Sequence, residues 1–290
     1  QLSEAEALLH EALQLWRVCA DENGTASTLH ELGVVHLRRA DWTAATELLT
    51  QSLEMKRGRR DVGVGEERAA ATRFSEEAAT LHQLAVAAMS SKPPRLDEAG
   101  ALLREALTVE AQGPFALVGR AATLQQLARV AERRGDRKGA RAMLQDALEL
   151  HRQAYGEAVP HVNKAAVLSQ LASLSLQSGD AELAAGYLTE ALGMRRQIYG
   201  RGSAHMEMAL NLGKLGECDR ARGDHSGAAT NFAAQRAMLE TLALSEAPAA
   251  ADAATSGQPL QRVIRAVAAG GEAMPPMRLL NHLQGAIRWQ

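Results

Sequence analysis

Apolar residues recur along the chain with the spacing of one helix face. From Ala184 the chain places apolar pairs at Tyr187-Leu188 and Ala191-Leu192, in steps of three, four, seven and eight residues. The same spacing begins at four further alanines and, more weakly, at a fifth: Ala5, Ala45, Ala99, Ala140 and Ala228. Successive anchoring alanines are 40, 54, 41, 44 and 44 residues apart. This period indicates a tandem repeat built from helices.

A second helix is predicted before five of these helices. Its pattern is Leu, two residues, Leu and then a small residue, which again marks one helix face. The copies are Leu29/Leu32/Gly33, Leu81/Leu84/Ala85, Leu124/Leu127/Ala128, Leu168/Leu171/Ala172 and Leu212/Leu215/Gly216. We call this helix A and the helix that begins at the anchoring alanine helix B.

Short sequences separate the two helices of a pair. They read "RGD" ending at Asp136 and Asp224, "SGD" ending at Asp180, and "RAD" ending at Asp41. Glycine takes the left-handed conformation that ends a helix. Aspartate then accepts hydrogen bonds from the first N–H groups of the next helix, worth about 1 kcal/mol. The pattern predicts tight turns between antiparallel helices.

The longer links between pairs carry a repeat of their own. Tyr155-Gly156 and Tyr199-Gly200 are each followed by a histidine, at His161 and His205. We expect both glycines to end a helix B and both histidines to stand at the start of the next helix A.

Small residues at fixed places let helix axes approach closely, and leucines fill the space between pairs. Each buried leucine contributes roughly 1.5–3 kcal/mol. Because no pair can bury its apolar face alone, pairs must stack. The sequence therefore predicts an all-α fold, a right-handed superhelical solenoid of antiparallel helix pairs with about five to six repeats.

The pattern resembles the tetratricopeptide repeat over roughly residues 3 to 242. Its period near 42–44 is similar to that of the kinesin light chain subclass. Gly156, Pro160 and Val162 match the lead-in of that subclass, and "LQQLA" at Leu124 and "LSQLA" at Leu168 match its core. The resemblance implies that helices A line a concave side, where polar side chains bind an extended peptide.

The pattern divides the chain into three segments. Residues 1–244 form the solenoid, of which 1–22 are a partial repeat that contributes helix B only. Residues 245–257 are rich in Ala, Ser and Pro and predict a flexible linker. Residues 258–290 predict two short amphipathic helices, which cap the solenoid or begin another domain; capping is the favoured interpretation. Within the solenoid, "SSKPPR" makes one turn longer, and Gly58 to Arg68 are expected to loop out.

Composition narrows the function classes. The chain has 290 residues, 46% hydrophobic and 3% aromatic, which favours helices over strands. A formal charge of −2 gives no reason to expect nucleic acid or an anionic membrane as partner, and no apolar run approaches about 18 residues. Cys19 and Cys218 form no disulfide or metal spacing, which suits a reducing compartment and predicts a cytoplasmic location.

The resemblance transfers the peptide-binding role to polar residues between and after the helix A leucines. The predicted peptide-binding groove comprises His30, Glu31, His82, Gln83, Gln125, Gln126, Arg129, Arg133, Gln170, Ser173 and Lys214. Amides suit such a role because they both donate to and accept from a peptide backbone. The alternative is that these residues are the solvated side of helix A.

Catalytic and metal chemistry find little support. His30 and His82 occupy equivalent places, but no third ligand recurs with them. The histidines of "HELGVVH", His30 and His36, are six residues apart, whereas a zinc protease helix needs a spacing of four. We expect no metal, no cofactor and no enzymatic activity.

These observations predict a non-catalytic protein-interaction scaffold or adaptor that binds a peptide segment in its concave groove. Two alternatives remain open. One is a ligand-sensing regulatory module of a larger multidomain protein, and the other is a structural subunit of a large assembly.

Overall fold

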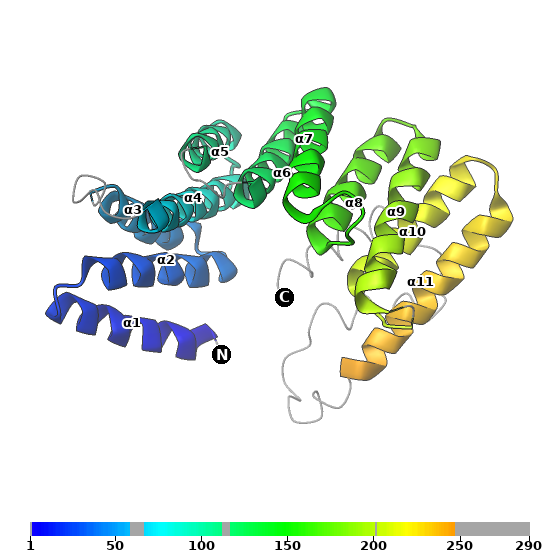
Figure 1. Ribbon diagram of the computed structural model, residues 1–290. Coiled ribbons are helices and arrows are strands. Elements are labelled where there is room, and N and C mark those ends of the chain that lie inside the picture. The colour runs from blue at the N-terminus through cyan, green and yellow to red at the C-terminus, as the bar shows by residue number, and fades with distance from the viewer. Residues whose placement is uncertain (1, 59–66, 112–116, 201, 247–290) are drawn as a thin grey trace. The chain divides into compact units, whose positions relative to one another are not determined.

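The chain is seen in a computed structural model that describes residues 2–58, 67–111, 117–200 and 202–246. All of the secondary structure in these ranges is helical, which confirms the all-α, TPR-like class (Figure 1). The predicted linker and C-terminal helices lie almost entirely outside the described residues. The last helix ends at Glu246, two residues beyond the predicted end of the solenoid.

The chain divides into two units, each described by itself: residues 1–157 and 158–290. The helices of the first are α1 (Leu2–Val18), α2 (Glu22–Arg38), α3 (Trp42–Gly58), α4 (Glu67–Ser90), α5 (Leu96–Glu110), α6 (Leu117–Arg133) and α7 (Arg137–Tyr155). Those of the second are α8 (Val162–Gln177), α9 (Ala181–Tyr199), α10 (Met206–Ala221) and α11 (His225–Glu246). The predicted A/B pairs are α2/α3, α4/α5, α6/α7, α8/α9 and α10/α11, and each pair packs together extensively. The first copy of the helix B pattern falls on α1.

The tight turns share one geometry, shown by the turn between α6 and α7. The Asp136 backbone N–H donates to Ala131 O at 2.9 Å, which closes the end of α6. The Asp136 carboxylate accepts from the Gly139 N–H at 2.8 Å and caps α7. Gly135, with φ 84°, supplies the left-handed residue between the helices. The same two bonds form at Asp21, Asp41, Asp180 and Asp224.

The sequence predicted four of these five turns. The turn at Asp21 was missed, because it joins α1 to α2 across a repeat boundary and has Ala20 in place of glycine. Ala20 and Ala40 adopt φ 54° and 60°. The turn between α4 and α5 differs, as its longer sequence predicted: Arg95 stands at the N-cap of α5 with no side-chain cap, and its N–H donates to Ala88 O at 2.8 Å.

The longer links confirm the Tyr-Gly prediction. Gly156 and Gly200 end α7 and α9 with φ 91° and 90°. His161 is the N-cap of α8, and its Nδ1 accepts from the Asn163 N–H at 3.2 Å. His205 is the N-cap of α10, with its ring stacked on Tyr199 at a centroid distance of 3.9 Å.

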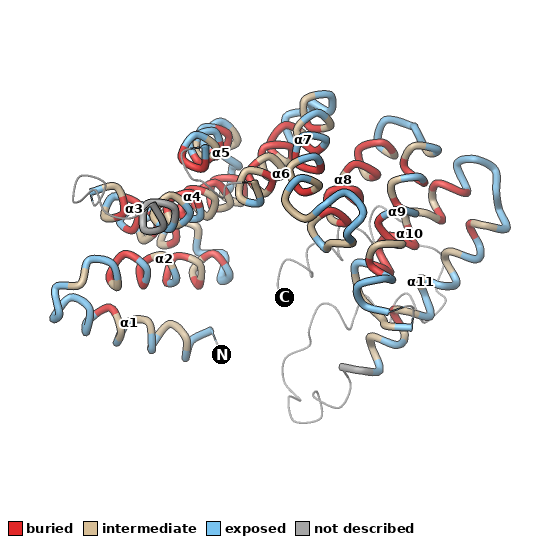
Figure 2. The backbone as a smooth tube through the Cα atoms, in the orientation of Figure 1, coloured by how far each residue is buried: buried red, intermediate tan, exposed pale blue. Residues whose placement is uncertain are grey.

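The core lies along seams between helices, so that buried residues form stripes rather than whole helices (Figure 2). The anchoring residues Ala45, Ala99, Ala140 and Ala184 are fully buried. A Cβ added at Gly33 would lie 2.6 Å from Leu49 Cγ, so this close approach requires glycine. The small-residue seams predicted from the sequence are confirmed.

Helices A of successive repeats contact one another although a helix B lies between them in the sequence. Apart from chain neighbours, the helices that meet are mainly helices A of successive repeats: α2 with α4, α4 with α6, and α8 with α10. This close approach places helices A on the inner side of the stack within each unit.

Replacing Gly33 by alanine tests the seam. We expect Gly33→Ala to lower the free energy of unfolding by about 1–3 kcal/mol, because the new methyl overlaps Leu49. The control is Gly186→Ala on α9, where an added Cβ meets nothing within 4 Å. That change should stabilise the helix by about 0.5–1 kcal/mol. Urea unfolding measures the free energy of unfolding of both variants. Equal effects of the two changes would contradict the close packing of Gly33 against Leu49.

Candidate functional site

The predicted groove residues all lie on helices A, but they have different surroundings. Glu31 and Arg133 are exposed and the others are half-buried. They belong to α2, α4, α6, α8 and α10 in turn. Because α7 and α8 fall in different units, the residues of α2, α4 and α6 form one group and those of α8 and α10 another.

His30 and His82 are each bonded to the next helix A. His30 Nδ1 lies 3.1 Å from Thr80 Oγ1. Thr80 donates its proton to Glu76 O at 2.9 Å, so it accepts from His30. Burial, together with Lys56, lowers the pKa of His30 from 6.5 to about 4. The ring is therefore neutral and joins two repeats.

The contact of His82 with Thr123 on α6 repeats this geometry one repeat later. Thr123 Oγ1 donates to Glu110 Oε2 at 2.7 Å, which assigns the His82 Nε2 proton to the bond with Thr123. Burial lowers the pKa of His82 to about 4. The two predicted groove histidines thus direct a ring nitrogen into the stack.

A third member completes each of these contacts, and the sequence analysis missed it. It lies on helix B, eleven residues after the anchoring alanine. Eleven residues are about three helical turns, so this residue and the alanine lie on the same face of the helix. The four residues at this place are polar and buried: Lys56, Glu110, His151 and Arg195. Their equal spacing in four consecutive repeats was the signal that could have found them.

We call these groups the inter-repeat polar triads. Lys56 Nζ donates to Thr80 Oγ1 at 2.8 Å and so joins the His30 contact. In the second unit Arg195 Nη1 and Asn211 Nδ2 both donate to Ser169 Oγ, at 3.0 and 2.9 Å. In each of these three triads a hydroxyl on one helix is bonded to side chains from two other helices. A buried polar group is costly unless it is bonded in this way.

The remaining copy has no hydroxyl at its centre. Gln125 Nε2 lies 3.4 Å from His151 Nε2. The His151 ring is stacked on Tyr155 one helical turn later, at a centroid distance of 5.7 Å. Gln125, predicted as a groove residue, therefore contacts helix B of its own pair.

Glu110 is the carboxyl member of these triads, and its pKa is shifted strongly. Burial raises its pKa from 4.5 to about 7, against the opposing effects of the Thr123 hydrogen bond and Arg120. A Cβ added at Gly119 would lie 2.7 Å from Glu110 Oε1, so glycine makes room for the carboxyl.

The α6 residues of the predicted groove form a cationic group. Arg129 Nη1 donates to Gln126 Oε1 at 3.0 Å. Arg133, one turn later, donates from Nη1 to Met89 O on α4 at 2.7 Å. The structure therefore brings three of the predicted residues together on one helix face.

The second unit brings Ser173 and Lys214 together. Lys214 Nζ donates to Ser173 Oγ at 2.7 Å, which joins α10 to α8. Gln170 lies one turn before Ser173; its Oε1 is buried and accepts no hydrogen bond within the described residues. Glu31 on α2 is exposed, and Gln83 on α4 is half-buried.

The described residues contain no group of three or more His, Cys, Asp or Glu side chains placed to hold a metal ion. None of the described helices is both long and apolar enough to cross a bilayer.

Comparison with known proteins supports the repeat class. Tetratricopeptide repeat family models match residues 1–58 and 120–161. The solved structure of BtubC (BKLC) from P. vanneervenii has a TM-score of 0.66 at 16% identity, covering 83% of this chain and 92% of that one. The nearly identical TPR-like repeats of a protein named as a kinesin light chain, from Podosopora anserina, have a TM-score of 0.56 at 21% identity, covering 74% and 95%. No curated protein matches the chain in sequence.

Residues 1–58 and 120–161 are thus matched as tetratricopeptide repeats, and the described helix pairs share the TPR-like solenoid fold. These helix pairs have the fold of kinesin light chain-like repeats. Such repeats are in general protein–protein interaction scaffolds and are typically non-catalytic.

Glu110 gives the fold a pH dependence with a definite sign. Between about pH 4.5 and 7 the Glu110 carboxyl is deprotonated in the unfolded chain but still protonated in the folded chain. The contribution of Glu110 to the free energy of unfolding therefore falls as pH rises through this range. We expect the melting temperature of Glu110→Gln to rise relative to that of the wild type as the pH increases from about 4.5 to 7, because the neutral amide has no proton to lose. Above about pH 7 the difference between the two melting temperatures should stay constant. Melting curves by circular dichroism measure the difference at each pH. Glu190→Gln, an exposed change on α9, is the control, and the same pH dependence in both would contradict the assignment.

Proposed function

We propose that the chain is a non-catalytic interaction scaffold that holds a peptide segment of a partner protein against polar side chains of its A helices. The repeat class supports interaction in general. The arrangement of Gln126, Arg129 and Arg133 on α6 is the observation that carries the finer proposal.

Arg129 and Arg133 lie one turn apart on the inner side of the first unit. Arg129 Nη1 donates to Gln126 Oε1, and Arg133 Nη1 donates to Met89 O. A planar guanidinium held in this way is prepared for a carboxylate or carbonyl oxygen, because less rotamer entropy is lost on binding. The charge of the pair favours a peptide segment that carries acidic side chains.

The second unit offers complementary chemistry. Lys214 supplies a cation held by Ser173. Gln170 is half-buried and lies one turn before Ser173, so its amide group belongs to the same stretch of α8. An extended peptide needs both donors and acceptors along its backbone.

His30, His82 and Gln125 have a different role in this proposal. Their bonds to Thr80, Thr123 and His151 set the spacing of the repeats. The peptide contacts then fall to Glu31, Gln83, Gln126, Arg129, Arg133, Gln170, Ser173 and Lys214.

A charge-reversal pair tests the proposal. We expect Arg129→Glu with Arg133→Glu to weaken capture of a bound partner at least about tenfold, or about 1.4 kcal/mol. Affinity capture followed by mass spectrometry identifies the partner. A photo-crosslinking amino acid at Gln126 should then label the same protein.

The matched control reverses two exposed cations elsewhere in the first unit, with Arg104→Glu on α5 and Lys138→Glu on α7. Circular dichroism verifies that both double variants are folded. Retention of every partner by the Arg129/Arg133 variant, or equal losses in the two variants, would contradict the peptide site on helix A.

A further inference from the structure

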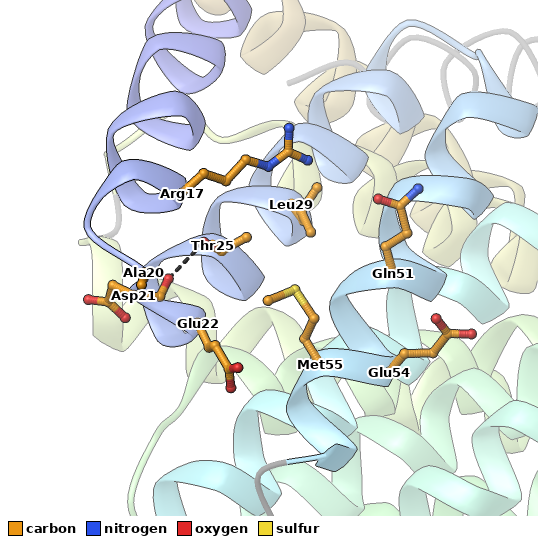
Figure 3. A pocket seen from close by; sticks show the side chains of 9 residues that line it. All are labelled: Arg17, Ala20, Asp21, Glu22, Thr25, Leu29, Gln51, Glu54 and Met55. Atoms are coloured by element: carbon orange, nitrogen blue, oxygen red, sulfur yellow. Dashed lines mark hydrogen bonds between the residues drawn. The ribbon is translucent and has the colours of Figure 1, made fainter.

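A groove of about 490 Å³ lies between α1, α2 and α3, apart from the α6 group (Figure 3). Arg17 borders it from α1, Thr25 and Leu29 from α2, and Gln51 and Met55 from α3. Leu29 is buried and Met55 half-buried, so apolar side chains form part of its wall.

The next repeat shows what fills the equivalent space. Arg17 stands twelve residues after Ala5, and Arg57 stands twelve after Ala45. Arg57 Nε lies 3.3 Å from Glu77 Oε1 on α4, and its Nη2 is paired with Glu105 on α5. Glu77 is only 3% exposed, whereas Arg57 and Glu105 are 39% and 47% exposed, so this ion-pair cluster runs from the buried seam to the surface of the second interface.

Both carboxylates are missing at the first interface. Thr25 stands at the place of Glu77, four residues before the first leucine of helix A, and Gln51 stands at the place of Glu105. The Thr25 hydroxyl donates to Asp21 O at 2.7 Å. Arg17 has no ion pair within the described residues. The groove therefore presents a guanidinium without the two carboxylates that pair with its counterpart Arg57 in the next repeat.

The other charges around the groove lie mainly at its opposite end. Figure 3 shows Arg17 and Gln51 reaching over the groove with Leu29 between them, and Glu22 at the far end. The Asp21 carboxylate accepts from the Gly24 N–H at 2.9 Å. Asp21 and Glu22 both stand at the N-terminus of α2, where the helix dipole offsets negative charge. Glu54 is exposed, so water screens its charge.

We propose that this groove binds a glutamate side chain of a partner protein. The carboxylate pairs with the Arg17 guanidinium and accepts from the Gln51 amide, and the methylene groups lie on Leu29 and Met55. The partner thereby supplies in trans the contact that Glu105 makes with Arg57 in the next repeat. This surface is a second contact, independent of the α6 group.

Nuclear magnetic resonance titration tests this site directly. A short oligoglutamate peptide with blocked ends is the probe, and an oligolysine peptide of equal length is its counterpart. The affinity is read only from amide signals of α1, α2 and α3, which separates this groove from the α6 face. We expect oligoglutamate to shift these signals.

Two variants should each weaken that affinity about tenfold. Arg17→Gln removes the cation, and Gln51→Glu places a carboxylate of the chain itself on Arg17. Both residues are exposed, and circular dichroism verifies the fold. Lys138→Gln on α7, which removes one exposed cation elsewhere, and the Arg129→Glu/Arg133→Glu pair should leave these shifts unchanged.

Each other result overturns the proposal. Shifts caused by oligolysine instead, and lost with Glu22→Gln and Glu54→Gln, would show that the groove takes a basic side chain. Shifts with oligoglutamate that persist in both Arg17→Gln and Gln51→Glu would place the carboxylate elsewhere. No shift with either peptide would show that the groove binds neither charge.

Discussion

Close approach of helix axes is the constraint on which the rest of the structure depends. It requires alanine or glycine at fixed places, because a side chain at Gly33 would overlap Leu49 and four of the anchoring alanines are fully buried. Without that approach the leucines of one pair could not fill the space against the next. The repeated Asp turns serve the same end, since they reverse the chain within a few residues and keep the two helices of a pair in contact.

Close seams exclude water, and every polar group that crosses them must then be bonded within the protein. The inter-repeat polar triads meet this requirement. They tolerate different chemistry at one place, with Lys56, Glu110 and Arg195 in three of the repeats, because a hydroxyl nearby can donate or accept as needed. Such a bonded group specifies the register between neighbouring pairs, whereas leucines alone would allow sliding.

The same register decides which side chains are left for a partner. Where a seam is complete, as at Arg57 with Glu77 and Glu105, the charges are used inside the protein. At Arg17 the corresponding carboxylates are absent, and on α6 two arginines are held at the surface. The binding surface that we propose at Arg17 thus lies where one copy departs from the pattern of its neighbour.

Periodicity alone determined the all-α class, the five helix pairs, their Asp turns and their small-residue seams, because these depend on local propensity and on helix spacing within one pair. The Tyr-Gly links and their histidine caps were predicted for the same reason. The roles of His30 and His82 were decided only by the tertiary structure. Their polar character fits both a groove and a seam, and the difference lies in Thr80 and Thr123, which approach from the next repeat some 40 to 50 residues away. The groove at Arg17 likewise depends on three helices meeting, and no single helix carries enough information to predict such a meeting.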